Sequence, residues 1–174
     1  MEEIILVNIL LTGLPGAGKT TIIKRVIEGG IDAGGFYTEE MREHGRRTGF
    51  KIVTLDGRTG ILADTKRESK LRVGKYRVNI QALEDLGVGS VSDAIGRKDV
   101  VIIDEIGKME LFSERFKEVV SRALDSDKIV LGTVMYKENP FTDAIKERRD
   151  TKVIIVDRSN RDELPGEILG MIRA

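Results

Sequence analysis

Apolar residues along the chain form short, continuous runs of the kind found in strands that are buried on both faces of a sheet. Four such runs cover residues 4–11, 100–103, 129–132 and 153–156. Between the runs, apolar residues recur every three or four positions, as on one face of an amphipathic helix. Four such helical stretches cover residues 20–27, 112–124, 141–148 and 163–172. Because buried strands and helices alternate, the pattern predicts an α/β fold with a mostly parallel sheet flanked by helices.

The middle of the chain has a different pattern, in which apolar and polar residues alternate in short stretches. It predicts antiparallel strands over residues 35–39, 49–55, 60–63 and 73–78. The dipeptide Asp56-Gly57 lies between the second and third of them and is typical of a hairpin turn. We therefore expect a β-rich insertion at about residues 35–79 within a single domain of residues 1–174. A helical stretch over residues 80–95, broken near residues 87–89, follows it.

Composition and charge narrow the possible functions. The 174 residues include 29 Lys and Arg, 29 Asp and Glu, and no Cys. A neutral chain has no general positive field that would attract nucleic acid, and without Cys it forms neither disulfides nor thiolate metal sites. The N-terminal residues are acidic, and the apolar run after them is too short for a signal peptide or a membrane span. We expect a cytoplasmic monomer with no membrane segment.

A phosphate-binding loop connects the first predicted strand to the first predicted helix. Residues 13–20 read Gly-Leu-Pro-Gly-Ala-Gly-Lys-Thr, a complete match to the pattern Gly-x-x-x-x-Gly-Lys-Ser/Thr. The glycines let backbone N–H groups turn toward phosphate oxygens. Lys19 supplies positive charge to the β- and γ-phosphates, and the Thr20 hydroxyl can bind Mg²⁺. The predicted nucleotide contacts here are Gly13, Leu14, Pro15, Gly16, Ala17, Gly18, Lys19, Thr20 and Thr21.

Two carboxylates, Asp104 and Glu105, follow the buried run at residues 100–103. In a phosphate-loop protein this is the Walker B arrangement, although an acidic helix cap after a strand would look similar. Asp104 is predicted to hold Mg²⁺ together with Thr20, and Glu105 to orient or deprotonate an attacking water. The string Asp-Glu-Ile-Gly also fits the Asp-x-x-Gly of regulatory GTPases. The sequence lacks their guanine-reading Asn-Lys-x-Asp, which argues against a guanine-specific switch.

Several polar residues could complete a catalytic site. Thr133 ends the run at residues 129–132, where it could contact the γ-phosphate or the water, or could only satisfy a local backbone group. Transferred phosphoryl groups need positive charge, which Lys19, Lys108 or an arginine such as Arg42 could supply. For each of Arg42, Arg46 and Arg47, a solvated surface position is the favoured interpretation.

Three further polar segments are weaker candidates. Asn160 and Arg161, after the last strand, could lie near the nucleobase, with an ordinary surface loop as the alternative. The basic run at residues 66–77 contains one aromatic residue, Tyr76, and fits a solvated face better than a nucleic-acid surface. His44 is expected on the surface.

Several strings together resemble the small nucleoside-triphosphatase family that includes the cancer-related nucleoside-triphosphatase. The most specific are Gly-Phe-Tyr-Thr-Glu-Glu at residues 35–40 and Asp-Glu-Ile-Gly-Lys-Met-Glu-Leu at residues 104–111. The resemblance implies a RecA-like P-loop NTPase fold and Mg²⁺-dependent hydrolysis of ATP, GTP, CTP and UTP to diphosphate and phosphate, with low base selectivity. By position, it adds nucleotide contacts at Val101, Ile102, Ile103, Asp104, Glu105, Ile106, Gly107 and Lys108.

Two other functions remain open from the sequence. A small-molecule or nucleoside kinase uses the same loop, and residues 42–47 could form its arginine-rich lid. A nucleotide-dependent module could instead bind RNA or a protein through the basic run at residues 66–77. Phosphate release without an acceptor molecule would distinguish hydrolysis from kinase activity.

Overall fold

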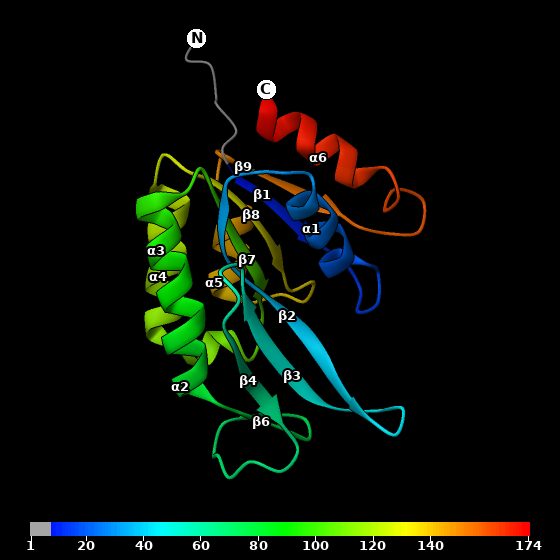
Figure 1. The fold of residues 1–174 in the computed structure, drawn as a ribbon, viewed down its shortest axis with the longest axis vertical. Coiled ribbons are helices and arrows are strands. Elements are labelled where there is room, and N and C mark those ends of the chain that lie inside the picture. Colours follow the sequence, from blue (N-terminus) through cyan, green and yellow to red (C-terminus); the bar gives the residue numbers. More distant parts are fainter. Residues whose placement is uncertain (1–7) are drawn as a thin grey trace.

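A computed structural model describes residues 8–174, and Figure 1 shows their arrangement. Within these residues, nine strands form one sheet in the order β5-β6-β4-β3-β2-β7-β8-β1-β9. The strands are β1 (Asn8–Thr12), β2 (Ala33–Glu43), β3 (Arg46–Thr54), β4 (Thr59–Asp64), β5 (Arg72–Val73), β6 (Tyr76–Val78), β7 (Val100–Ile106), β8 (Ile129–Val134) and β9 (Thr151–Ile155). The helices are α1 (Lys19–Glu28), α2 (Ile80–Ala82), α3 (Gly89–Arg97), α4 (Glu114–Asp125), α5 (Pro140–Lys146) and α6 (Leu164–Arg173), with a π-helix at Leu83–Val88 and a 3₁₀ turn at Glu110–Phe112.

The sheet has a parallel part and an antiparallel part. Strands β2, β7, β8, β1 and β9 are adjacent and parallel, whereas β2, β3, β4, β6 and β5 pair antiparallel in that order. This confirms the predicted α/β fold with a mostly parallel sheet and added antiparallel strands. The predicted first strand is β1 from Asn8 onward, and residues 4–7 lie outside the described residues.

Helices cover both faces of the sheet (Figure 1), with α1 and α6 on one face and α3 and α4 on the other. Side chains of α1 and α6 pack with those of β1 in one core cluster. In the second cluster, Phe36 of β2 meets Phe116 of α4 edge to face, with ring centroids 6.2 Å apart. Because both faces are covered, all of β1 and nearly all of β7 and β8 are buried, which explains their continuous apolar runs.

The structure corrects two details of the sequence prediction. The strand expected at residues 73–78 is two short strands, because Gly74 turns the chain with φ of 58°. The helical break expected near residues 87–89 is wrong, since the backbone stays helical from Ile80 to Arg97 through the π-helix. The absence of a side chain at Gly87 allows Leu83 and Phe36 to pack closely against the helix. A β-carbon at this position would lie 3.1 Å from Leu83 and 3.6 Å from Phe36.

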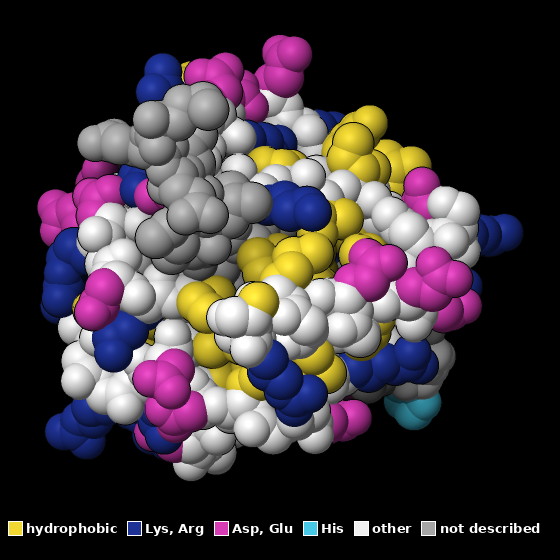
Figure 2. Space-filling model, turned by 90° about the horizontal axis from the view of Figure 1, so that it is seen from above, with side chains coloured by type: hydrophobic (Ala, Val, Ile, Leu, Met, Phe, Trp, Pro, Cys, Tyr) yellow, Lys and Arg dark blue, Asp and Glu magenta, His cyan; other side chains and the backbone are white. Residues whose placement is uncertain are grey.

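The surface carries charges of both signs. On the face seen in Figure 2, basic and acidic side chains are interspersed, with hydrophobic side chains between them. Among the helices from residue 8 onward, none has the length and apolar character needed to cross a membrane.

Candidate functional site

The phosphate loop joins the carboxyl end of β1 to the first turn of α1. Three of its glycines have positive φ, with values of 145° at Gly13, 80° at Gly16 and 102° at Gly18. At Gly13 a β-carbon would lie only 2.7 Å from the carbonyl oxygen of Val156, so the strand packing requires glycine there. The loop therefore has the backbone conformation that turns N–H groups toward an anion.

The Lys19 side chain turns back onto this loop. Its Nζ donates hydrogen bonds to the carbonyl oxygens of Gly13, at 2.7 Å, and Leu14, at 3.3 Å. These bonds hold the ammonium group against the start of the loop, and Lys19 itself is the first residue of α1. Both the side chain and the helix dipole place positive charge at this point.

Asp104 lies on β7, with strand β8 between it and the phosphate-loop strand β1. Its side chain is buried, and Oδ1 accepts a hydrogen bond of 2.6 Å from the Thr133 hydroxyl at the end of β8. Thr133 thus binds the Asp104 carboxylate rather than a local backbone group. Burial raises the pKa of Asp104, while hydrogen bonds from Thr133 and Thr20 and the charge of Lys19 oppose the rise.

The donor atoms at this corner of the site suit Mg²⁺. Asp104 Oδ2 is buried and has no hydrogen-bond partner among residues 8–174, and the Thr20 hydroxyl is close enough to influence its pKa. Both are hard oxygen donors, and Mg²⁺ in nucleotide sites commonly takes one or two protein ligands together with substrate phosphates. In the described part of the chain, no cluster of three His, Cys, Asp or Glu side chains could hold an ion alone. Thr20 and Asp104 would therefore bind the ion jointly with the nucleotide.

Glu105 follows Asp104 through a cis peptide bond and is half-buried. Burial and the neighbouring charge of Asp104 raise its pKa, and Lys19 lowers it. Its carboxylate folds over Gly107, where an added β-carbon would lie 2.5 Å from Glu105 Oε1. Glycine at position 107 thus leaves room for the Glu105 side chain. A carboxylate with a raised pKa is well suited to accept a proton from water near neutral pH.

The sequence reasoning gave no role to Glu110, which the structure buries almost completely. Burial and the charge of Glu105 raise its pKa well above the usual range; the charge of Asp104 adds to this, whereas backbone N–H groups of Glu110 and Gly107 lower it. Glu110 forms no ion pair within residues 8–174. The local sequence gave no signal of this burial, because Glu110 between the apolar Met109 and Leu111 is equally compatible with an exposed carboxylate.

The predicted basic residues lie in different settings. Arg42 and Arg47 bind Glu40 at 2.7 and 3.1 Å within the β2–β3 hairpin, and Arg47 also donates a 2.8 Å hydrogen bond to the Tyr76 hydroxyl. Arg46 is exposed near the tip of the same hairpin, beside His44, which is exposed as predicted. Lys108 is exposed directly after Gly107, on the loop that follows Glu105. Of these cations, Lys108 is nearest in the chain to the carboxylates.

The contacts inferred by position on β7 and the loop after it divide into two groups. The side chains of Val101, Ile102, Ile103 and Ile106 are fully buried, so they support the sheet rather than face a ligand. Asp104, Glu105, Gly107 and Lys108 follow at the carboxyl end, where ligands of parallel sheets bind.

The side chains of Asn160 and Arg161 contact different parts of the structure. Asn160 binds within its own loop, since Nδ2 donates to the Ile155 carbonyl at 2.7 Å and Oδ1 accepts from Asp157 N–H at 2.9 Å. The Arg161 side chain lies against the phosphate loop, because a β-carbon at Gly18 would be 3.6 Å from Arg161 Cδ. The structure therefore places the Arg161 side chain, and not the Asn160 side chain, against the phosphate loop.

Comparison with known proteins gives a consistent result. A family model described as NTPase matches residues 8–169. Nucleoside-triphosphatase THEP1 of Thermotoga sp. strain RQ2 is 52% identical over 166 residues, which cover 95% of each chain. The crystal structure of THEP1 from the hyperthermophile Aquifex aeolicus has a TM-score of 0.88 at 36% identity and covers 96% of this chain and 99% of that one. The solution structure of a human cancer-related nucleoside triphosphatase has a TM-score of 0.82 at 38% identity, with 95% and 97% covered.

Proposed function

Because the chain belongs to the NTPase family, whose model spans nearly all of its described residues, we propose that it hydrolyses nucleoside triphosphates to diphosphate and phosphate with Mg²⁺ as cofactor. Its relatives are named as nucleoside-triphosphatases, and the enzyme is one too. The observation that supports the proposal best is the meeting of three groups at one sheet edge: the phosphate loop, the Asp104–Thr133 pair and Glu105.

Each group has a distinct part in the proposed reaction. Backbone N–H groups of the phosphate loop and Lys19 bind the phosphates and offset the charge that grows on them. Thr20 and Asp104 hold Mg²⁺, which would supply Lewis-acid stabilisation of the phosphate oxygens. Thr133 fixes the rotamer of Asp104 through its 2.6 Å hydrogen bond. Glu105 orients the attacking water and accepts its proton.

Low base selectivity also fits the site. The proposed base contact is Arg161, whose guanidinium can stack on any base. Asn160, which could have read a base by paired hydrogen bonds, uses both ends of its amide group within its own loop. We therefore propose that ATP, GTP, CTP and UTP are all substrates.

Hydrolysis is favoured over kinase activity because two of the arginines that could cover the phosphates form ion pairs elsewhere. Arg42 and Arg47, candidates for a phosphate lid, are bound to Glu40 in the hairpin. Release of inorganic phosphate from ATP and Mg²⁺ in the absence of any acceptor would support hydrolysis, and release that requires an added nucleoside would support the kinase instead.

The variant Glu105→Gln tests the role of the proposed base. Glutamine keeps the size of the side chain but cannot accept the proton, so we expect turnover to fall about a hundredfold with nucleotide affinity retained. Phosphate release measures turnover, and fluorescence titration with a labelled nucleotide measures binding. Glu114→Gln, on an exposed residue of α4, is the matched control. Near-normal turnover in Glu105→Gln would remove Glu105 from the catalytic role.

A further inference from the structure

A second cluster of polar side chains lies in the antiparallel part of the sheet, far from the phosphate loop. The loop between β4 and β5 borders an open surface cavity of about 630 Å³. Four cations line it, namely Lys66, Arg67, Lys70 and Arg77, together with the single carboxylate of Glu68. The sequence favoured a solvated face for this basic run, and Lys66 and Lys70 are indeed exposed. The structure adds that four of its side chains lie around one cavity.

The loop has a defined conformation rather than only a high density of charge. Asp64 Oδ1 accepts the backbone N–H groups of Lys66, at 3.2 Å, and Arg67, at 2.7 Å. Arg77 Nη1 donates a 2.8 Å hydrogen bond to the carbonyl oxygen of Ser69, which connects β6 to the loop. These bonds fix the positions from which the cations extend.

The cations of the cavity have few anionic partners. Within residues 8–174, Arg67, Lys70 and Arg77 form no ion pair, and Lys66 makes only a 3.7 Å contact with Glu43 between exposed side chains. Arg67 Nε is buried without a hydrogen-bond acceptor in the same range. A guanidinium partly withdrawn from water without a carboxylate raises the free energy of the molecule, and a bound anion would offset this.

The chemistry of the lining indicates the kind of anion. Guanidinium and ammonium groups, with the hydroxyl groups of Thr65 and Ser69 beside them, are the donors that bind phosphate oxygens. The volume is in the range of sites for small organic ligands. We propose that this cavity is a second anion site, which binds the phosphate group of a small phosphorylated ligand.

The position of the cavity makes it separate from the catalytic centre. Strand β4 is five strands away from β1 in the sheet, which corresponds to about 24 Å at the usual strand spacing. A ligand in the cavity therefore cannot share phosphates with the nucleotide on the phosphate loop. The proposal does not depend on hydrolysis at that loop.

The test uses the full chain with Lys19→Ala, which weakens phosphate binding at the catalytic loop. Backbone amide resonances of residues 64–71 are followed by NMR during titration with pyrophosphate at constant ionic strength. We expect saturable shifts in this loop. Adding Arg67→Gln and Lys70→Gln should weaken the binding at least tenfold, because two of the four cations are lost. Adding Arg97→Gln and Arg122→Gln, which remove two exposed charges from α3 and α4, should leave it unchanged.

Three results would overturn the proposal. They are the absence of saturable shifts, an equal loss of binding in the control, and shifts caused only by a single-stranded oligonucleotide and not by pyrophosphate. If the double substitution destabilises the loop, Lys70→Gln alone keeps the test decisive. Lys70 is exposed, so its substitution should not affect folding. It should weaken pyrophosphate binding several-fold. Hydrolysis by Arg67→Gln with Lys70→Gln, made without the Lys19 change, should stay at the wild-type rate.

Discussion

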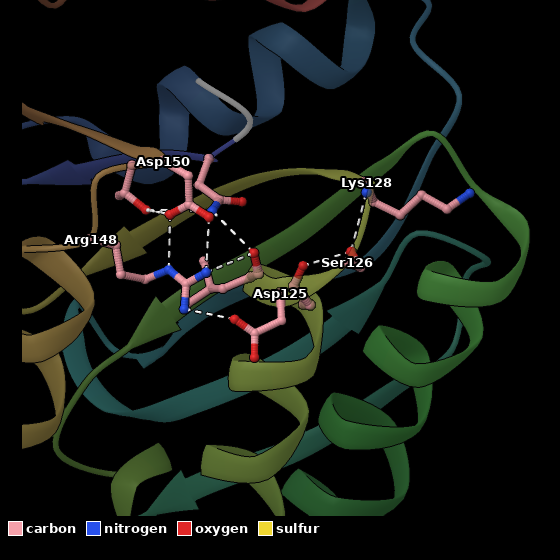
Figure 3. A network of polar contacts seen from close by, with 9 residues as sticks. Asp125, Ser126, Lys128, Arg148 and Asp150 are labelled. Carbon is pink, nitrogen blue, oxygen red and sulfur yellow. Dashed lines mark hydrogen bonds and ion pairs between the residues drawn. The ribbon is translucent and has the colours of Figure 1, made fainter. Parts of the chain in front are cut away.

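The two ends of the parallel strands differ in how their charged groups are paired. At the amino end, Arg148 forms an ion pair with Asp125 at 2.8 Å and a two-pronged pair with Asp150 at 2.9 and 3.0 Å, as Figure 3 shows. At the carboxyl end, Asp104 and Glu110 are buried and form no ion pair within residues 8–174.

The pKa values follow the same division. Arg148 lowers the pKa of Asp150, whereas burial raises the pKa values of Asp104 and Glu110. Paired charges stabilise the fold, whereas buried carboxylates without counter-ions lower the free energy of unfolding unless a metal or ligand binds to them. Substitutions at the carboxyl end should therefore lower activity without lowering stability. Substitutions at the amino end should lower stability without changing activity.

The variant Asp104→Asn should have the largest effect. It removes the proposed metal ligand, so hydrolysis should fall on the order of a thousandfold or more. It also removes a charge that burial disfavours, so the melting temperature should stay the same or rise. Phosphate release and thermal unfolding measure the two quantities. A drop in melting temperature similar to that of a core variant would contradict the contrast between the two ends.

Thr133→Val tests the support of Asp104 from the neighbouring strand. Valine keeps the shape but loses the 2.6 Å hydrogen bond to Asp104 Oδ1, and outer-shell partners of metal ligands commonly contribute 10- to 100-fold. We expect turnover to fall by about that factor and the Mg²⁺ concentration for half-maximal rate to rise. Thr133→Ser, which retains the hydroxyl group, should keep most of the activity. Equal losses in both variants would assign Thr133 a packing role instead.

Arg148→Ala tests the other end of the strands. Removing the guanidinium breaks its contacts with Asp125, Asp150 and the Leu124 carbonyl. Because these groups are partly exposed, the expected loss is about 1–2 kcal/mol of unfolding free energy, or a few degrees in melting temperature. Turnover below the transition should not change. Arg149→Ala, at the exposed neighbouring position, should leave both quantities as in the wild type.

The sequence predicted the local parts of this arrangement better than the long-range ones. The phosphate loop and the buried strands are visible because each depends on neighbouring residues. The Thr133–Asp104 bond depends on β8 lying between β1 and β7, and strand order is not encoded in any local pattern. Gly107 is recognisable in the sequence as part of a motif, but its contact with the Glu105 side chain is known only from the structure.

Glu110 shows why burial of a charged group was missed. A Glu between Met109 and Leu111 has the same local pattern whether its carboxylate faces water or the interior. Its burial depends on the 3₁₀ turn at Glu110–Phe112, in which the Leu111 N–H donates a 3.0 Å hydrogen bond to the Gly107 carbonyl. The predicted helix start at residue 112 passed over this turn.

Glu110→Gln should change the melting temperature by no more than Arg148→Ala does, and its effect should depend most strongly on pH. The pKa of Glu110 is raised in the folded state by burial and by Glu105, so the protonated form is favoured on folding. Its contribution to stability is complete below the unfolded pKa of about 4.3 and is lost as pH rises through the folded pKa. Glutamine stays neutral, so the variant should melt a few degrees above the wild type at pH 8 and close to it at pH 4.5.

Thermal unfolding of wild type and variant at both pH values measures this difference, with Glu118→Gln at an exposed site of α4 as the matched control. The control should show no pH-dependent gain, because its carboxylate remains in water. The opposite result is also informative. If Glu110→Gln lowers the melting temperature equally at both pH values, the N–H groups of Gly107 and Glu110 stabilise the ionised carboxylate enough to overcome burial. Glu110 would then belong with the paired charges of the amino end, and the contrast would be restricted to Asp104 and Glu105.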